Sequence, residues 1–193
     1  MIGSRAPTMM AGVALLAAVS LAACGKSSQP SAEPTVSQPA TVSAMQMTST
    51  AFGAGNTLPE EYTCDGAGRS PPLAWSGAPA NARSFALIVE DPDAPDGTFR
   101  HWGVYDIPAG THELAEGASG KDGLKQVKND FGKSGYGPPC PPKGDPPHHY
   151  RFRLLALNVT QLSGSPGNVK DLLDATDGHV VGNGELMALY GRR

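Results

Sequence analysis

Glycine and proline interrupt this chain so often that long helices have little room to form. The 24 glycines and 18 prolines make up more than a fifth of the 193 residues. Both residues disfavour helix interiors and favour turns. With 39% hydrophobic residues, the pattern predicts a globular, mainly β fold in which turns and ordered loops join the strands.

The N-terminal segment has the pattern of an export signal. Arg5 gives it a thin positive start, and residues 9–22 (MMAGVALLAAVSLA) are almost wholly apolar but short for a transmembrane helix. Small residues then precede Cys24, which resembles the processing site of bacterial lipoproteins. We therefore expect residues 1–23 to be a signal peptide and Cys24 to carry lipid, palmitate included, that anchors the protein at the extracytoplasmic face of the cell membrane. An ordinary signal peptide with an incidental cysteine is the alternative.

The segment after Cys24 is rich in Ser, Pro, Thr and Ala and has no apolar periodicity. Such a segment buries too little surface to order itself, so we expect residues 24–44 to be a disordered tether. An ordered arm on the domain is the alternative. Residues 45–193 then form one domain. Removing residues 1–23 takes away only Arg5 and changes the net charge from −3 to −4, and without a basic stripe we expect no nucleic-acid partner.

Two cysteines remain in the domain, Cys64 and Cys140. An isolated pair in an exported protein predicts a disulfide. The alternatives are two buried thiols, or a reactive thiol at Cys140.

Apolar runs bounded by turn residues mark the candidate strands. The clearest is Ser84–Glu90 (SFALIVE), and the others are Met45–Thr50, Leu73–Trp75, His101–Ile107, Gln126–Asn129 and Tyr150–Asn158. Helical patterns are confined to the end of the chain, at Val169–Ala175 and Val180–Tyr190. The second holds Gly182 and Gly184, each of which costs a helix about 1 kcal/mol relative to alanine.

Three segments carry the polar residues with useful chemistry. Asp91 and Asp93 lie in a proline-stiffened turn (DPDAP, ending at Pro95) directly after the clearest strand, although such aspartates often only bond nearby backbone N–H groups. His101 opens the next strand. A proline-rich loop leads to His148, His149 and Tyr150, and the two histidines point to opposite sides if the chain there is extended.

These side chains are compatible with three kinds of chemistry. They could bind an anion, hold a metal through two histidines and a carboxylate, or act as an acid–base pair. The sequence has no HExxH motif, CxxC spacing, G-x-S-x-G elbow or P-loop. We therefore expect no catalysis, no cofactor and no metal.

Several stretches together resemble the phosphatidylethanolamine-binding protein family, in particular its bacterial Raf-kinase-inhibitor-like branch. The resemblance covers residues 45–193. The matching stretches are SPPLAW at 70–75, DPDAP at 91–95, His101-Trp102 with residues 104–108, the GP…CPPKG…H-x-Y run at 137–150, and residues 178–192.

The resemblance implies a large antiparallel sheet packed on a smaller one, with a C-terminal helix. It also implies a pocket for phosphate or a phosphorylated headgroup. By their places in the matching motifs, the ligand-binding residues are Asp91, Asp93, Pro95, His101, His148 and Tyr150. Asp91 could accept from a histidine N–H and fix its tautomer, whereas Pro138 and Pro139 remove backbone donors near the pocket mouth.

We therefore expect a membrane-tethered, non-catalytic binding protein for small anionic or phosphorylated ligands, whose affinity rises as pH falls through the histidine range. One alternative is a protein partner in the same groove, such as a protease or kinase that the protein inhibits. A metal-dependent hydrolase is a second alternative.

Overall fold

The structure is a computed structural model and describes residues 42–121 and 123–193. The predicted signal peptide, Cys24 and most of the predicted tether lie outside these residues. The elements, in chain order, are β1 (Ser43–Ala44), β2 (Gln46–Thr48), the 3-10 helix η1 (Glu60–Tyr62), β3 (Leu73–Ser76), β4 (Ser84–Asp91), β5 (Phe99–Pro108), β6 (Glu113–Leu114), the 3-10 helix η2 (Ala118–Gly120), β7 (Lys125–Gln126), β8 (His148–Leu157), α1 (Val169–Thr176) and β9 (Val180–Tyr190).

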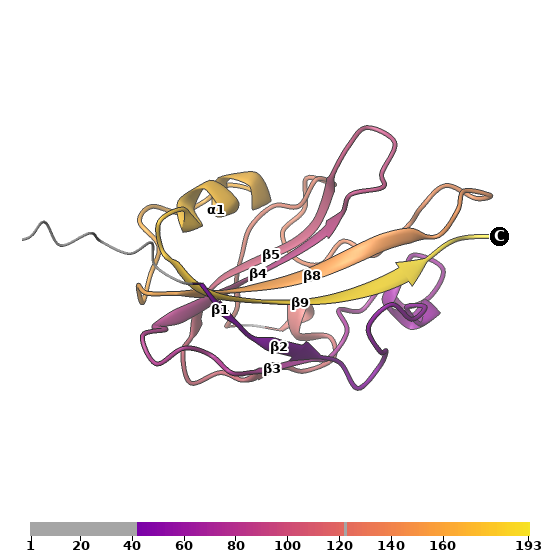
Figure 1. Cartoon of the computed structure of the whole chain (residues 1–193). Coiled ribbons are helices and arrows are strands. Elements are labelled where there is room, and N and C mark those ends of the chain that lie inside the picture. The colour runs from indigo at the N-terminus through magenta and orange to yellow at the C-terminus, as the bar shows by residue number, and fades with distance from the viewer. Residues whose placement is uncertain (1–41, 122) are drawn as a thin grey trace, which may run out of the picture. The chain divides into compact units, whose positions relative to one another are not determined.

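The strands form two sheets, as the sequence predicts. The larger has the order β1-β9-β8-β4-β5-β7 and the smaller the order β2-β3-β6. Neighbouring strands are antiparallel, except that β1 runs parallel to β9. The small sheet lies against one face of the large sheet and α1 against the other (Figure 1). The mainly β class, with one helix close to the C-terminal strand, is confirmed.

The continuous apolar run of β4 follows from its place between two layers. Phe85 and Leu87 belong to the hydrophobic cluster that includes Trp75 of the small sheet. Ala86 and Ile88 point the other way, into a second cluster with Leu172 of α1. Because successive side chains of a strand face opposite sides, a strand covered on both faces must be apolar throughout. The burial of every residue of β4 fits this arrangement.

The helix predicted at Val169–Ala175 is confirmed as α1. The side-chain oxygen of Asn168 accepts from the backbone N–H of Asp171 and caps its first turn. A Cβ atom at Gly103 of β5 would lie 2.6 Å from Val127 and 3.0 Å from Val169. The absence of a side chain at Gly103 therefore lets the helix approach the sheet closely.

The helix considered for Val180–Tyr190 is wrong, because this segment is β9 and pairs with β8 along its whole length. Its burial alternates with period two, as in a strand with one covered face. A Cβ atom would lie 2.9 Å from Pro79 at Gly182, and 3.1 Å from the Met45 carbonyl oxygen at Gly184. The two glycines therefore make room for Pro79 and for the chain from Ser43 to Met45, which lies close against β9. A helical pattern does not reveal this tertiary contact.

The other strand predictions are confirmed with shifted ends. The run from Met45 shortens to β2, and Tyr150–Asn158 becomes β8. Of the run predicted at Gln126–Asn129 only Gln126 lies in a strand, at the end of β7. β1 lies within the residues assigned to the tether, so the sheet begins two residues before the expected boundary at Met45.

The predicted disulfide is present between Cys64 and Cys140, whose Cα atoms lie 5.3 Å apart. It ties the chain after η1 to the proline-rich loop that precedes β8. In the part of the chain described here, no helix is long and apolar enough to cross a membrane.

Candidate functional site

The candidate site forms where three strands of the large sheet end together. β4 is antiparallel to both β5 and β8, so its last residue, Asp91, lies beside the first residues of these strands. Asp91 shares a face with the apolar residues of β4 that point towards the small sheet. His148 and Tyr150 lie on the same face of β8, because they are spaced by two. The sheet itself therefore brings together residues that are far apart in the sequence.

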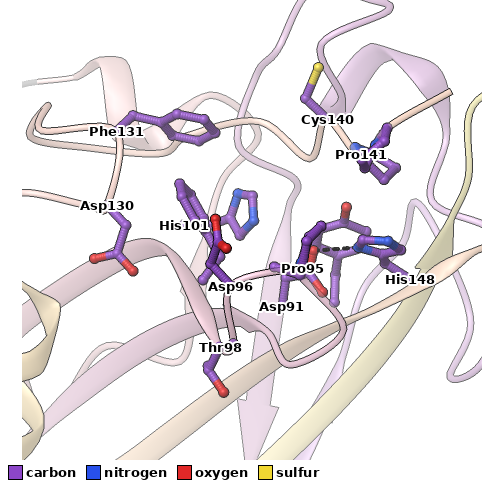
Figure 2. Close-up of a pocket in the computed structure, with 15 residues that line it drawn as sticks. Asp91, Pro95, Asp96, Thr98, His101, Asp130, Phe131, Cys140, Pro141 and His148 are labelled. Carbon is purple, nitrogen blue, oxygen red and sulfur yellow. Dashed lines mark hydrogen bonds and ion pairs between the residues drawn. The ribbon is translucent and has the colours of Figure 1, made fainter. Parts of the chain in front are cut away.

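A cavity of about 480 Å³ opens at this end of the sheet (Figure 2). Its walls come from the turn after β4, the starts of β5 and β8, the turn that holds Asp130 and Phe131, and the proline-rich loop. The lining residues are Asp91, Ala94, Pro95, Asp96, Gly97, Thr98, Phe99, His101, Asp130, Phe131, Cys140, Pro141, Pro142, His148 and Tyr150.

Asp91 is fully engaged within the protein. Its Oδ1 accepts from the backbone N–H of Asp93 at 2.9 Å, and its Oδ2 accepts from Nδ1–H of His148 at 2.8 Å. The first bond is the turn interaction and the second is the histidine interaction that the sequence suggested. Since both side chains are buried, Asp91 acts as the residue that fixes the tautomer and direction of His148. The Nε2 atom of His148 is left for the cavity, and the nearest carboxylate oxygen, on Asp145, is 3.9 Å away.

His101 is held by a different partner. Its Nδ1 lies 2.8 Å from the carbonyl oxygen of Gly137, and because a carbonyl can only accept, Nδ1 carries the proton. Burial lowers the pKa of His101, against a smaller opposing effect of the Gly137 carbonyl. The imidazole is therefore neutral at neutral pH, and its Nε2 carries a lone pair. That atom is buried and has no hydrogen-bond partner.

Tyr150 lies between the two histidines and is completely buried. Its ring centroid is 5.3 Å from that of His101 in an edge-to-face arrangement, and 6.4 Å from that of His148 in a stacked one. Burial, followed by the charge of Asp91 and a hydrogen-bonding interaction with its carboxylate, raises the pKa of its phenol. The hydroxyl therefore keeps its proton, and it is buried near Asp91 without a hydrogen bond of regular geometry.

The charge of the cavity is unusual for an anion site. Asp91, Asp96 and Asp130 contribute carboxylates to the lining, and no lysine or arginine of the described residues lines it. Arg100 lies nearby, but it is engaged with Asp130 at 3.6 Å and with Glu90 at 4.0 Å. An anion in this cavity must therefore be held by hydrogen-bond donors rather than by a fixed cation.

The rim carries aromatic residues that the sequence interpretation missed. Phe131 is 48% exposed, and its ring lies 4.7 Å from that of Phe99. Asn129 positions this turn by accepting from the backbone N–H groups of Phe131 and Lys133. Asn129-Asp130 and Gly132 signal a turn, but nothing local indicates which end of the sheet it meets.

Asp93 is the predicted site residue that lies elsewhere. Its Oδ2 accepts from both the backbone N–H and Nδ1–H of His149, each at 2.7 Å. This exposed pair lines a neighbouring cavity of about 370 Å³, separated from the first by His148. The expectation that His148 and His149 point to opposite sides is confirmed, since the first is buried and the second exposed.

Two further observations limit the chemistry of the site. Among residues 42–121 and 123–193, no group of three or more His, Cys, Asp or Glu residues could hold a metal ion. Pro138 and Pro139 do not line the 480 Å³ cavity. The carbonyl of Pro139 instead accepts from the backbone N–H of Cys64 beside the disulfide.

Comparisons with known proteins agree on one family. The family model described as phosphatidylethanolamine-binding protein matches residues 48–191. An Aquifex aeolicus UPF0098 protein is 44% identical over 152 residues, which cover 77% of this chain and 89% of the relative. A UPF0098 protein of Chlamydia trachomatis is 46% identical over 152 residues, covering 76% of this chain and 98% of the relative.

Solved structures give the same result. A phosphatidylethanolamine-binding protein homologue from Chlamydia trachomatis has a TM-score of 0.70 and 44% identity, covering 78% of this chain and 99% of its own. Escherichia coli YbcL, described as a new member of the mammalian PEBP family, has a TM-score of 0.73 and 34% identity, covering 77% and 99%. The chain therefore belongs to the phosphatidylethanolamine-binding protein family.

Proposed function

We propose that this protein binds small anionic or phosphorylated molecules in the 480 Å³ cavity, without converting them, while a lipid on Cys24 holds it at the extracytoplasmic face of the cell membrane. One observation carries the ligand proposal. Two polar atoms of residues that line the cavity, Nε2 of His101 and the hydroxyl of Tyr150, are buried without a regular hydrogen bond to the described residues. Buried polar groups in folded proteins are nearly always satisfied, so these two atoms fit a bound ligand.

The remaining geometry favours binding over catalysis. Each oxygen of Asp91 accepts a hydrogen bond from within the protein, and its bond to His148 gives it the role of orienting that imidazole. Cys140 is oxidised in the disulfide and so cannot act as a nucleophile. What the cavity offers is a set of fixed donors and acceptors in a buried place, which suits recognition.

A binding titration tests the ligand proposal. Inorganic phosphate and phosphoethanolamine would be titrated into the full-length chain, into His148→Ala and into His179→Ala, an exposed histidine that does not line the cavity. Saturable binding that His148→Ala abolishes and His179→Ala retains is the expected result. The proposal is wrong if neither ligand binds the unaltered chain.

The anchoring proposal has a separate test. Cells expressing the chain would be labelled with radioactive palmitate and fractionated, and compared with cells expressing Cys24→Ala. We expect label and membrane association in the first and neither in the second, because two acyl chains give stable anchoring. Labelling that survives in Cys24→Ala would place the lipid elsewhere.

A further inference from the structure

The unpartnered atoms of the cavity differ in kind, and this difference restricts the ligand. Nδ1–H of His101 is committed to the Gly137 carbonyl, so the free Nε2 of the neutral ring can only accept a hydrogen bond. The Tyr150 hydroxyl, which holds its proton, can donate one. The two rings pack edge to face with centroids 5.3 Å apart, yet their polar atoms do not bond to each other.

An acceptor beside a donor is complementary to a group that carries one of each. The edge of an oxyacid that retains a proton, HO–X–O⁻, donates through its hydroxyl and accepts through its charged oxygen. A fully ionised oxyanion presents only acceptors, so its lone pairs would face the lone pair of His101. An unmatched buried acceptor costs about 1–3 kcal/mol, which corresponds to roughly a tenfold to hundredfold loss of affinity.

The charges around the cavity act in the same direction. Among the described residues, Asp91, Asp96 and Asp130 line it without a lysine or arginine, so each negative charge on the ligand is opposed by the protein. An oxyanion that keeps a proton therefore brings less charge than its own fully ionised form. Hydrogen phosphate and sulfate carry the same double negative charge, so between these two anions the hydroxyl donor of hydrogen phosphate makes the difference. We propose that this cavity selects oxyanions that retain a proton, with hydrogen phosphate as the simplest case, and rejects fully ionised ones of the same shape such as sulfate. This inference rests on the proposed anion-binding function and adds the protonation state of its ligand.

The groups that face His101 determine when this selection should weaken. They are the carboxylates of Asp91 and Asp130, the imidazole of His148 and the phenol of Tyr150. Burial and His148 keep His101 neutral, whereas the carboxylates favour its protonation. Once acid protonates Nε2, that atom becomes a donor and should donate to a sulfate oxygen as readily as to a phosphate oxygen.

The test compares two tetrahedral anions of similar size. Phosphate and sulfate would be titrated calorimetrically into the full-length chain at pH 7.5 and at pH 5. The expected result is at least tenfold tighter binding of phosphate at pH 7.5, and a smaller ratio at pH 5. Equal affinities at pH 7.5 would overturn the proton selection and leave the anion site intact, whereas no binding of either anion would overturn both proposals.

Substitution of His101 tests whether its Nε2 atom is the hydrogen-bond acceptor for the ligand. In His101→Asn the amide N–H can replace Nδ1–H towards Gly137, while the Nε2 acceptor is lost. We expect its phosphate affinity to fall roughly tenfold or more, towards that for sulfate. The matched control is His179→Asn, whose exposed ring is near Asn158 and which should keep the full ratio. An unchanged phosphate-to-sulfate ratio in folded His101→Asn would overturn the role given to His101.

Discussion

The imidazole of His148 donates through Nδ1–H to Oδ2 of Asp91 across 2.8 Å, joining the first residue of β8 to the last residue of β4. Both side chains are almost completely buried. Because Asp91 also holds the turn after β4, this one carboxylate determines both the shape of the turn and the direction of the imidazole.

Replacing this carboxylate should cost both stability and binding. Asp91→Asn keeps the shape but cannot accept both bonds as a charged group does, so we expect the free energy of unfolding to fall by about 1–3 kcal/mol. Phosphate affinity should fall as well, since His148 loses its fixed orientation. Urea denaturation and the titration described above would measure the two effects.

The control for this prediction is Asp145→Asn, which removes a half-exposed carboxylate 3.9 Å from the same imidazole. We expect its stability to change by less than about 0.5 kcal/mol. Equal losses in the two variants would contradict the role assigned to Asp91.

How far the sequence could predict the site depends on the element each residue occupies. Asp91 and His148 adjoin clear strands, and strand alternation together with the motif resemblance was enough to place both in the cavity. Phe131 and Asp130 lie in a turn between weak elements, and no periodicity links such a turn to a particular end of a sheet. Asp93 belongs to the same motif as Asp91. It lies two residues further along the turn, however, and its carboxylate contacts His149 instead of entering the cavity.

The strands of the fold were also predictable where their apolar patterns are clear, and β9 is the exception. The unbroken apolar run of β4 reflects a strand covered on both faces, and it predicts a central strand. The segment of β9 allows a helix by its apolar residues, although its two glycines weigh against one. The reason for those glycines is the close approach of Ser43, Met45 and Pro79, which are remote in sequence.

Reduction of the Cys64–Cys140 disulfide should loosen one wall of the cavity. The bond closes a loop across a separation of 76 residues, which in the chain-entropy model contributes roughly 4 kcal/mol to stability, and often less in practice. Cys140, Pro141 and Pro142 all line the cavity, so phosphate affinity should fall too. Thermal melts and titrations with and without dithiothreitol would measure both effects.

The double variant Cys64→Ser, Cys140→Ser is the control for this experiment. It should be less stable than the parent and should not respond to dithiothreitol. If reduction changes stability but not affinity, the wall is held by other contacts, such as the bond from the Cys64 backbone N–H to the Pro139 carbonyl.

His101 should make the protein less stable in weak acid. Burial holds its pKa below the ordinary value of 6.5, so between the two pKa values the unfolded chain binds more protons than the folded one. Stability from this residue is therefore complete above about pH 6.5 and is lost as the pH falls towards the folded-state pKa, at no more than about 1.4 kcal/mol per pH unit. Urea midpoints at pH 7.5, 6.5 and 5.5 would show the decline.

The comparison for this pH dependence is His101→Asn, which cannot titrate in this range. The variant should be less stable at pH 7.5 but should lose less stability than the parent between pH 6.5 and 5.5. Identical slopes in the two proteins would assign the acid sensitivity to other residues.

The close approach of Pro79 and Ser43 to β9 should make Gly182 intolerant of a side chain. A Cβ atom there would lie 2.9 Å from the Pro79 ring and 3.2 Å from the Ser43 carbonyl oxygen. Gly182→Ala must therefore move the chain that lies against β9, and we expect a loss of about 1–3 kcal/mol in unfolding free energy.

Gly110→Ala is the matched control, because a Cβ atom there meets nothing within 4 Å. The lower entropy of the unfolded chain should leave the stability of this variant equal or slightly raised. Phosphate affinity should be unchanged in both variants, since neither glycine lines the cavity. If Gly182→Ala were as stable as Gly110→Ala, β1 would not be packed on β9 as tightly as the structure has it.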